Sequence, residues 1–140
     1  MRKQIVLGLG LIAALVLTAC GGGGGSTGGA DAGRGETLYK QSTIGTASAP
    51  GCITCHSLNP GEVLVGPSHA GVATRAADII KSAEYTGTAT TVEEYLRESI
   101  VSPDAHLETG FTAGVMYANF GKELSEQEIG DLVAYMATLK

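Results

Sequence analysis

The sequence has no tryptophan, two phenylalanines and five tyrosines among its 140 residues, so large side chains for a hydrophobic core are scarce. Charged residues make up 16% of the chain, below the share of about a quarter that is usual in globular proteins. The main apolar stretch, residues 5–17, is shorter than the roughly 20 residues that a transmembrane helix needs. A domain of this size buries only a modest share of its surface, so we expect a further component at its centre.

Basic residues are outnumbered, because nine Lys and Arg stand against 14 Asp and Glu. Arg2 and Lys3 precede position 20 and all the acids follow it, so residues 20–140 hold seven basic and 14 acidic side chains, a net charge of −7. Nucleic-acid binding uses a basic patch. This balance therefore argues against a nucleic-acid partner and favours partners that present a basic surface.

The first twenty residues have the order of an export signal. Arg2 and Lys3 form a positively charged start, and the apolar stretch 5–17 has the length of the hydrophobic region of a secretory signal. The segment ends Leu17-Thr18-Ala19-Cys20, which resembles the lipobox of bacterial lipoproteins, where the cysteine is acylated and the signal is cleaved just before it. The alternative is an ordinary signal peptide followed by an unrelated cysteine. We predict a lipid on Cys20 that anchors the exported chain to a membrane, facing the periplasm or the cell exterior.

A glycine-rich segment with almost no apolar side chains follows. Such a composition cannot bury enough surface to offset its ordering entropy, and about twelve residues of flexible coil span about 19 Å on average. The sequence therefore predicts three parts: a signal peptide over 1–19, the lipidated Cys20 with a flexible tether over 20–32, and a folded domain over 33–140.

The signals within the domain are helical. A short helix is predicted around Gly35 and Tyr39, and a weaker alanine-rich helix over 73–83. Thr91 with Glu94, and Ser125 with Glu128, form capping boxes that open two more helices. The last helix carries an apolar stripe at i, i+3, i+4 and i+7: Ile129, Leu132, Val133 and Met136. No segment alternates convincingly with period two, so the predicted fold class is all-α with long loops.

Cys52-Ile53-Thr54-Cys55-His56 is a Cys-x-x-Cys-His motif, the attachment signal of c-type haem. The thiols of Cys52 and Cys55 can each add to a haem vinyl group, and His56 then lies beneath the iron as its proximal ligand. A zinc site usually needs a second cysteine pair, and a thioredoxin-type dithiol lies in a βαβ unit. A structural disulfide is a further alternative in an exported protein.

A haem with one histidine has either a sixth ligand or an open position. The candidates are Met116, Met136, His69 and His106. Met116 lies in a predicted loop, from which a thioether can reach the opposite haem face and raise the potential. Core packing explains Met136, a surface loop explains His106, and His69 is too close behind the proximal side. We predict that His56 and Met116 are the axial ligands.

Residues 33–140 resemble the class I cytochromes c. The similarity is carried by Gly35 and Tyr39, the attachment motif, Gly66-Pro67, the Met116 loop and Leu132-Val133-Ala134-Tyr135. The resemblance implies three to five helices around one covalent haem c, with the first and last helices crossing. It also implies that the Pro67 carbonyl accepts a hydrogen bond from the His56 ring. One departure is Tyr117, since many members have Pro after the ligand methionine.

The resemblance implies electron transfer rather than enzyme activity, because a six-coordinate haem leaves no position for a small-molecule substrate. We expect a tethered carrier between respiratory or photosynthetic complexes, or a fixed subunit of such a complex, with redox proteins as partners. An open-site haem enzyme or gas sensor is the alternative. Residues 99–116 are also similar to cytochrome c domains fused to haem–copper oxidase subunits. A tethered monohaem lipoprotein is similar to the monohaem subunit of alternative complex III.

Overall fold

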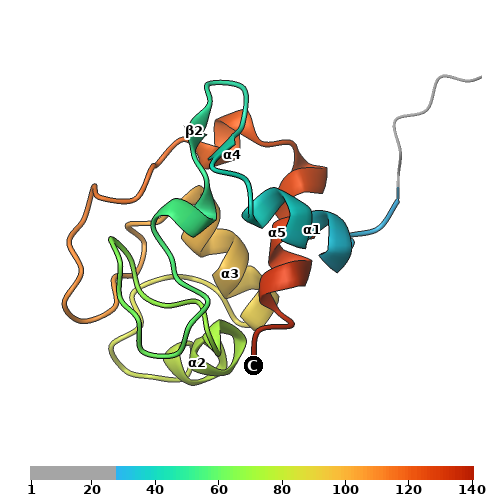
Figure 1. Cartoon of the computed structure of the whole chain (residues 1–140). Helices are drawn as coiled ribbons and strands as arrows, with labels where there is room; N and C mark the ends of the chain where they lie inside the picture. The colour runs from blue at the N-terminus through green and yellow to red at the C-terminus, as the bar shows by residue number, and fades with distance from the viewer. Residues whose placement is uncertain (1–27) are drawn as a thin grey trace, which may run out of the picture.

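Helices α1 (Ala32–Tyr39) and α5 (Glu126–Met136) cross in the computed structural model, which describes residues 28–140 (Figure 1). They pack together more extensively than any other pair of elements. Gly35 allows this approach, because a Cβ there would lie 1.9 Å from the carbonyl oxygen of Asp131. The rings of Tyr39 and Tyr135 meet nearby, with centroids 5.3 Å apart. The predicted crossing of the first and last helices is confirmed.

Helix α1 begins earlier than the predicted start of the domain at residue 33. The side chain of Asp31 caps it by accepting a hydrogen bond from the Arg34 amide, and the Asp31 amide donates to Asp131 at 2.7 Å. Arg34 also pairs with Asp131 at 2.7 Å, and this hydrogen bond is the main reason that the pKa of Asp131 falls to about 2. Asp31 and Ala32 thus lie with the folded domain, whereas the predicted signal peptide and Cys20 lie outside the described residues.

The remaining helices follow the sequence signals in part. They are the short 3₁₀ helix η1 (Cys52–Thr54), α2 (Val72–Ile79), α3 (Val92–Val101) and α4 (Phe120–Glu123). Both capping boxes are present, at the starts of α3 and α5. Helix α2 is shorter than the predicted 73–83, and α4 was not predicted, because four residues carry no periodic pattern.

A small hairpin is the departure from the prediction of helices alone. Strands β1 (Thr43–Ile44) and β2 (Ala49–Pro50) pair antiparallel, with Thr43 opposite Pro50. Two residues per strand are too few to show alternation in a sequence. The fold class remains all-α, since the helices supply most of the buried core side chains.

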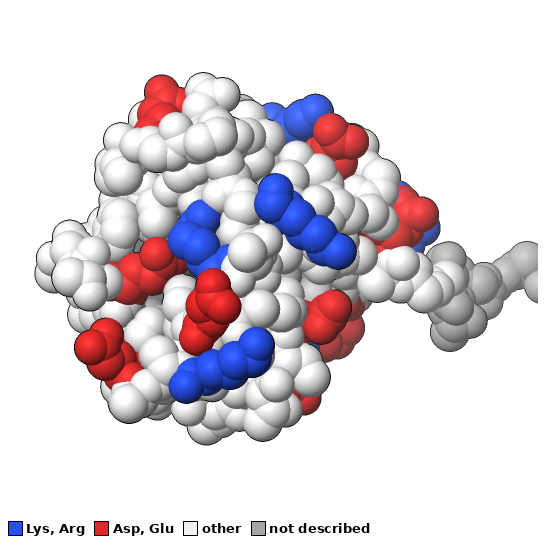
Figure 2. Space-filling view, turned by 90° about the horizontal axis from the view of Figure 1, so that it is seen from below, with Lys and Arg blue, Asp and Glu red and all other residues white. Residues whose placement is uncertain are grey.

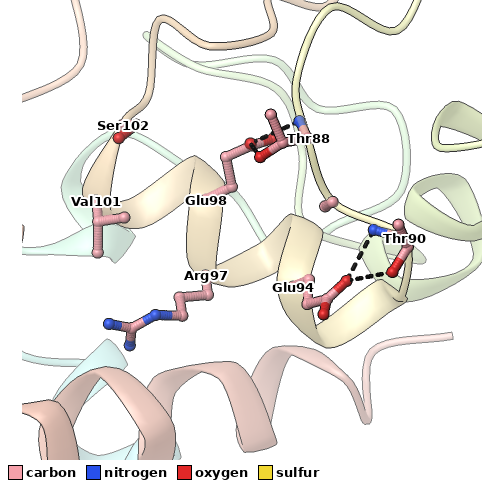
Figure 3. Close-up of a pocket in the computed structure, with 8 residues that line it drawn as sticks. Thr88, Thr90, Glu94, Arg97, Glu98, Val101 and Ser102 are labelled. Atoms are coloured by element: carbon pink, nitrogen blue, oxygen red, sulfur yellow. Dashed lines mark hydrogen bonds between the residues drawn. The ribbon is translucent and has the colours of Figure 1, made fainter.

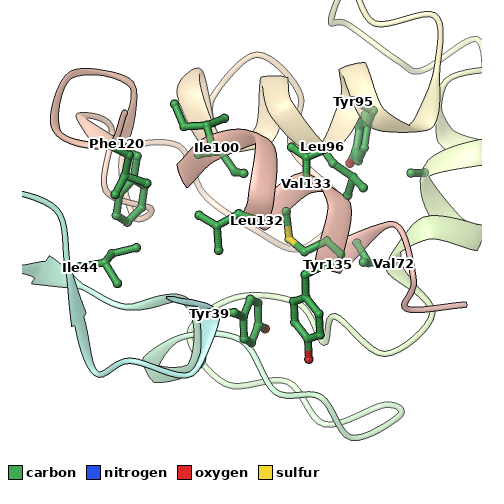
Figure 4. Packing of buried hydrophobic residues seen from close by; sticks show 14 of the residues in the cluster. Tyr39, Ile44, Val72, Tyr95, Leu96, Ile100, Phe120, Leu132, Val133 and Tyr135 are labelled. Carbon is green, nitrogen blue, oxygen red and sulfur yellow. The ribbon is translucent and has the colours of Figure 1, made fainter. Parts of the chain in front are cut away.

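The core joins side chains from α1, the hairpin, α2, α3, α4 and α5 (Figure 4). Its largest fully buried members are Tyr39, Leu96, Ile129 and Leu132. None of the helices within residues 28–140 is long and apolar enough to cross a membrane. On the face seen in Figure 2, acidic and basic side chains are interspersed, so that face carries no patch of one sign.

Candidate functional site

A cavity of about 590 Å³ lies between η1, the segment 65–69, helix α3, the loop 103–118 and the end of α5. Cys52, Cys55, His56 and Met116 all line it, although the methionine is far from the others in sequence. Its volume lies within the roughly 300–1,000 Å³ of ordinary ligand and cofactor pockets. The structure therefore brings the predicted attachment and axial residues to one cavity.

The attachment motif folds as one helical turn. The amide of His56 donates to the Cys52 carbonyl at 2.9 Å, and that of Cys55 donates to the same carbonyl at 3.2 Å. Cys52 and Cys55 are free thiols, so the disulfide alternative has no support. Burial raises the pKa of Cys52 to about 11. No cluster of three or more metal-ligating His, Cys, Asp or Glu side chains occurs within residues 28–140, which leaves the zinc alternative without support as well.

His56 is held as a neutral imidazole. The residue is 8% exposed, and its Nδ1 donates to the Pro67 carbonyl at 2.9 Å. Burial lowers the pKa of His56, and the weaker effect of the Pro67 hydrogen bond raises it. With the proton on Nδ1, Nε2 keeps the lone pair that binds a metal. The Pro67 carbonyl thus lies where it can orient the imidazole and raise its basicity.

A second imidazole lies against the first. The rings of His69 and His56 stack, with centroids 3.9 Å apart and planes 18° apart, and Nδ1 of His69 is 3.0 Å from the Tyr39 hydroxyl. Arg75 steadies this segment by donating to the carbonyls of Ser68 and Ala70. His69 is thus a neighbour of His56, the predicted proximal ligand, as its sequence position suggested. No pattern in the sequence indicated the stacking or the contact with Tyr39.

Gly66 leaves the space that the His56 ring fills. A Cβ at position 66 would lie 2.4 Å from Cε1 and 2.8 Å from Nδ1 of that ring. The backbone there is fixed, because the Gly66 amide donates to the Cys55 carbonyl at 2.9 Å. The close approach of backbone and ring explains why glycine stands before Pro67.

Met116 reaches the cavity from the loop 102–119, which contains turns but no helix or strand (Figure 1). Gly110 and Gly114 adopt positive φ angles of 95° and 75° in this loop. The Gly114 amide donates to the Asp104 carboxylate at 2.9 Å, which ties the two halves of the loop together. Met136 is 4% exposed and both packs in the core and lines the cavity.

His106 lies in the loop 102–119, as predicted, but its side chain is not simply a surface one. His106 is partly buried and lines the cavity. Its ring lies edge-on to Tyr85, with centroids 5.2 Å apart, and near Tyr95 at 6.3 Å. The two tyrosines offer an apolar surface that the loop sequence alone did not reveal. His106 is therefore the alternative to Met116 as the second axial ligand, and the variants described in the Discussion distinguish the two.

A shallower depression of about 420 Å³ lies along α3 and the segment before it (Figure 3). Its carboxylates already have partners. Glu98 accepts hydrogen bonds from the Thr88 amide and hydroxyl at 2.8 and 2.9 Å, and Glu94 accepts from those of Thr90 at 2.8 and 2.7 Å. These contacts fix the segment before α3 to the helix and use the carboxylates, so the first cavity is the candidate site.

A comparison with protein families supports the cofactor that the residues of this cavity indicate. The family model described as Cytochrome c matches residues 32–140. The chain belongs to the cytochrome c family. No curated protein and no solved structure gives a significant match. As a cytochrome c the protein binds haem c covalently, with one haem for its single domain, and functions in haem-based electron transfer. The paired thiols, the neutral imidazole and the largely apolar cavity fit that cofactor.

Proposed function

We propose that this cytochrome c binds its haem through thioethers to Cys52 and Cys55, with His56 and Met116 as the axial ligands. It moves single electrons outside the cytoplasm, as a tethered carrier or a subunit of a respiratory or photosynthetic membrane complex. The observation that carries the ligation is the cavity, which the two thiols, the imidazole and the thioether all line.

Each residue has a separate task in this proposal. The thiols would hold the haem, and the Pro67 carbonyl, 2.9 Å from Nδ1 of His56, orients the ring and leaves Nε2 free to bind the iron. A thioether ligand from Met116 favours the reduced iron and so raises the potential. The largely apolar lining of the cavity would shield both ligands from water once the haem is bound. The bound haem itself supplies one-electron chemistry.

A redox titration with carbon monoxide binding tests this ligation. The purified protein should titrate as a one-electron couple, and its oxidised form should show the weak near-infrared absorption of His/Met ligation. With both axial positions occupied, the reduced form should be low-spin and bind carbon monoxide slowly. Fast and complete carbon monoxide binding by the wild-type protein would instead indicate the alternative, an open-site enzyme or gas sensor.

The membrane anchor is proposed from the sequence, because Cys20 lies outside the described residues. Several acyl chains, each with many methylenes at about 0.8 kcal/mol apiece, hold a protein on a bilayer far more firmly than one chain does. We therefore expect membranes from expressing cells to keep the wild-type protein through a high-salt wash, and Cys20→Ser to be soluble or uncleaved. Salt screens charge but not acyl burial, so release of the wild type by salt alone would refute the lipid anchor.

A further inference from the structure

The residue that follows the proposed iron ligand is tied to the protein by its own side chain. The hydroxyl of Tyr117 donates a hydrogen bond to Oε1 of Glu123. Its ring packs edge-on against Phe120, with centroids 5.1 Å apart and planes 69° apart. The side chain of Tyr117 therefore lies against helix α4, and these two contacts restrain it more than an ordinary loop side chain.

Both contacts of Tyr117 lead to fixed parts of the fold. Phe120 is 5% exposed and belongs to the core. Glu123 ends helix α4, and its Oε2 accepts a hydrogen bond from the Ala47 amide at 3.3 Å, in the turn between β1 and β2. The Glu123 carboxylate thus joins Tyr117, in the loop 102–119, to the hairpin.

We propose that Tyr117 is a positioning residue that keeps the Met116 thioether at the iron. Consecutive Cα atoms are only 3.8 Å apart, so fixing the side chain of residue 117 restrains the backbone next to residue 116. A proline at this position would restrain the loop by locking its own φ angle. Tyrosine achieves the restraint by tertiary contacts with Glu123 and Phe120 instead. The inference rests on the proposed ligation by Met116.

Competition with imidazole measures how firmly Met116 is held. The oxidised holoprotein is titrated with imidazole while the near-infrared His/Met band is followed. Tyr117→Phe keeps the ring contact with Phe120 and removes only the hydroxyl. A hydrogen bond to a charged group affects such equilibria by about tenfold or more, so we expect this variant to lose the band at an imidazole concentration on the order of tenfold lower. Glu123→Gln, which weakens the same hydrogen bond, should shift the imidazole concentration at which the band is lost in the same direction.

The chain offers a matched control in Tyr85. Its hydroxyl likewise donates to a helix carboxylate, that of Glu98 in α3, but it does not adjoin an iron ligand. Tyr85→Phe should leave the imidazole midpoint at the wild-type value. Equal shifts in Tyr85→Phe and Tyr117→Phe would mean general loosening and would overturn the positioning role, as would a wild-type midpoint in Tyr117→Phe.

Failure of the ligation itself gives a different result. If the wild-type protein lacks the band, or keeps it after Met116→Ala, then Met116 is not the ligand and the proposed function fails first. If the wild type shows the band but Tyr117→Phe keeps the wild-type midpoint, only the positioning role fails. Should Tyr117→Phe give no holoprotein, Glu123→Gln carries the same decision.

Discussion

Met116→Ala should abolish the near-infrared band of the oxidised protein, lower its reduction potential and open the iron to carbon monoxide. The thioether of Met116 lines the cavity from the loop 102–119, and an alanine methyl cannot bind a metal. Loss of a ligand that favours reduced iron lowers the potential. Absorption spectra, a potentiometric titration and the rate of carbon monoxide binding measure the three effects.

Two other cavity residues serve as controls for this variant. Met136→Ala should keep the band and lower the free energy of unfolding by about 2–5 kcal/mol, the usual cost for a buried side chain, because Met136 is 4% exposed. His106→Ala should leave the spectrum unchanged. If the spectrum instead changes with His106 and survives loss of Met116, the haem has two histidine ligands and a lower potential than we propose.

Gly66→Ala should displace the proximal imidazole. The added Cβ would lie 2.4 Å from Cε1 of His56, and the backbone cannot retreat without breaking the hydrogen bond from the Gly66 amide to Cys55. Turning the ring would break its hydrogen bond to Pro67. Overpacking of this kind costs about 1–3 kcal/mol. We expect a lower melting temperature and a high-spin fraction in the oxidised spectrum.

Gly130→Ala is the matched control for that variant. Its Cβ would lie 3.6 Å from the Cβ of Ala30, an ordinary contact, and the site is in the middle of α5. Alanine there favours the helix by roughly 0.5–1 kcal/mol, so the variant should keep a wild-type spectrum and lose no stability. A wild-type spectrum and melting temperature in Gly66→Ala would show that the close approach to His56 is unimportant.

Local chemistry made the core of the site predictable. Cys52, Cys55 and His56 lie within one helical turn, so their spacing alone brings the three side chains together. The capping boxes were predictable for the same reason, because each involves residues three positions apart. The crossing of α1 and α5 came from the family resemblance, and Gly35 supplies its physical basis.

Contacts between segments that are distant in the sequence could not be predicted from it. His69 stacks on His56 only because the segment 66–70 folds back under the attachment turn, where Gly66 and Arg75 hold it. His106 was assigned to the surface because its tyrosine neighbours lie on other segments. The hairpin and α4 were missed because elements of two to four residues have no period to detect.

The sequence by itself determined the attachment motif, the helical class and the helix starts, since each depends on neighbours along the chain. Only the tertiary structure decided how the second half of the chain meets that motif. Met116 reaches the cavity through a loop without regular structure, and Tyr117 is tied to Glu123 and Phe120 rather than stiffened by proline. Such contacts depend on which surfaces the packed helices leave exposed, and no spacing along the chain encodes them.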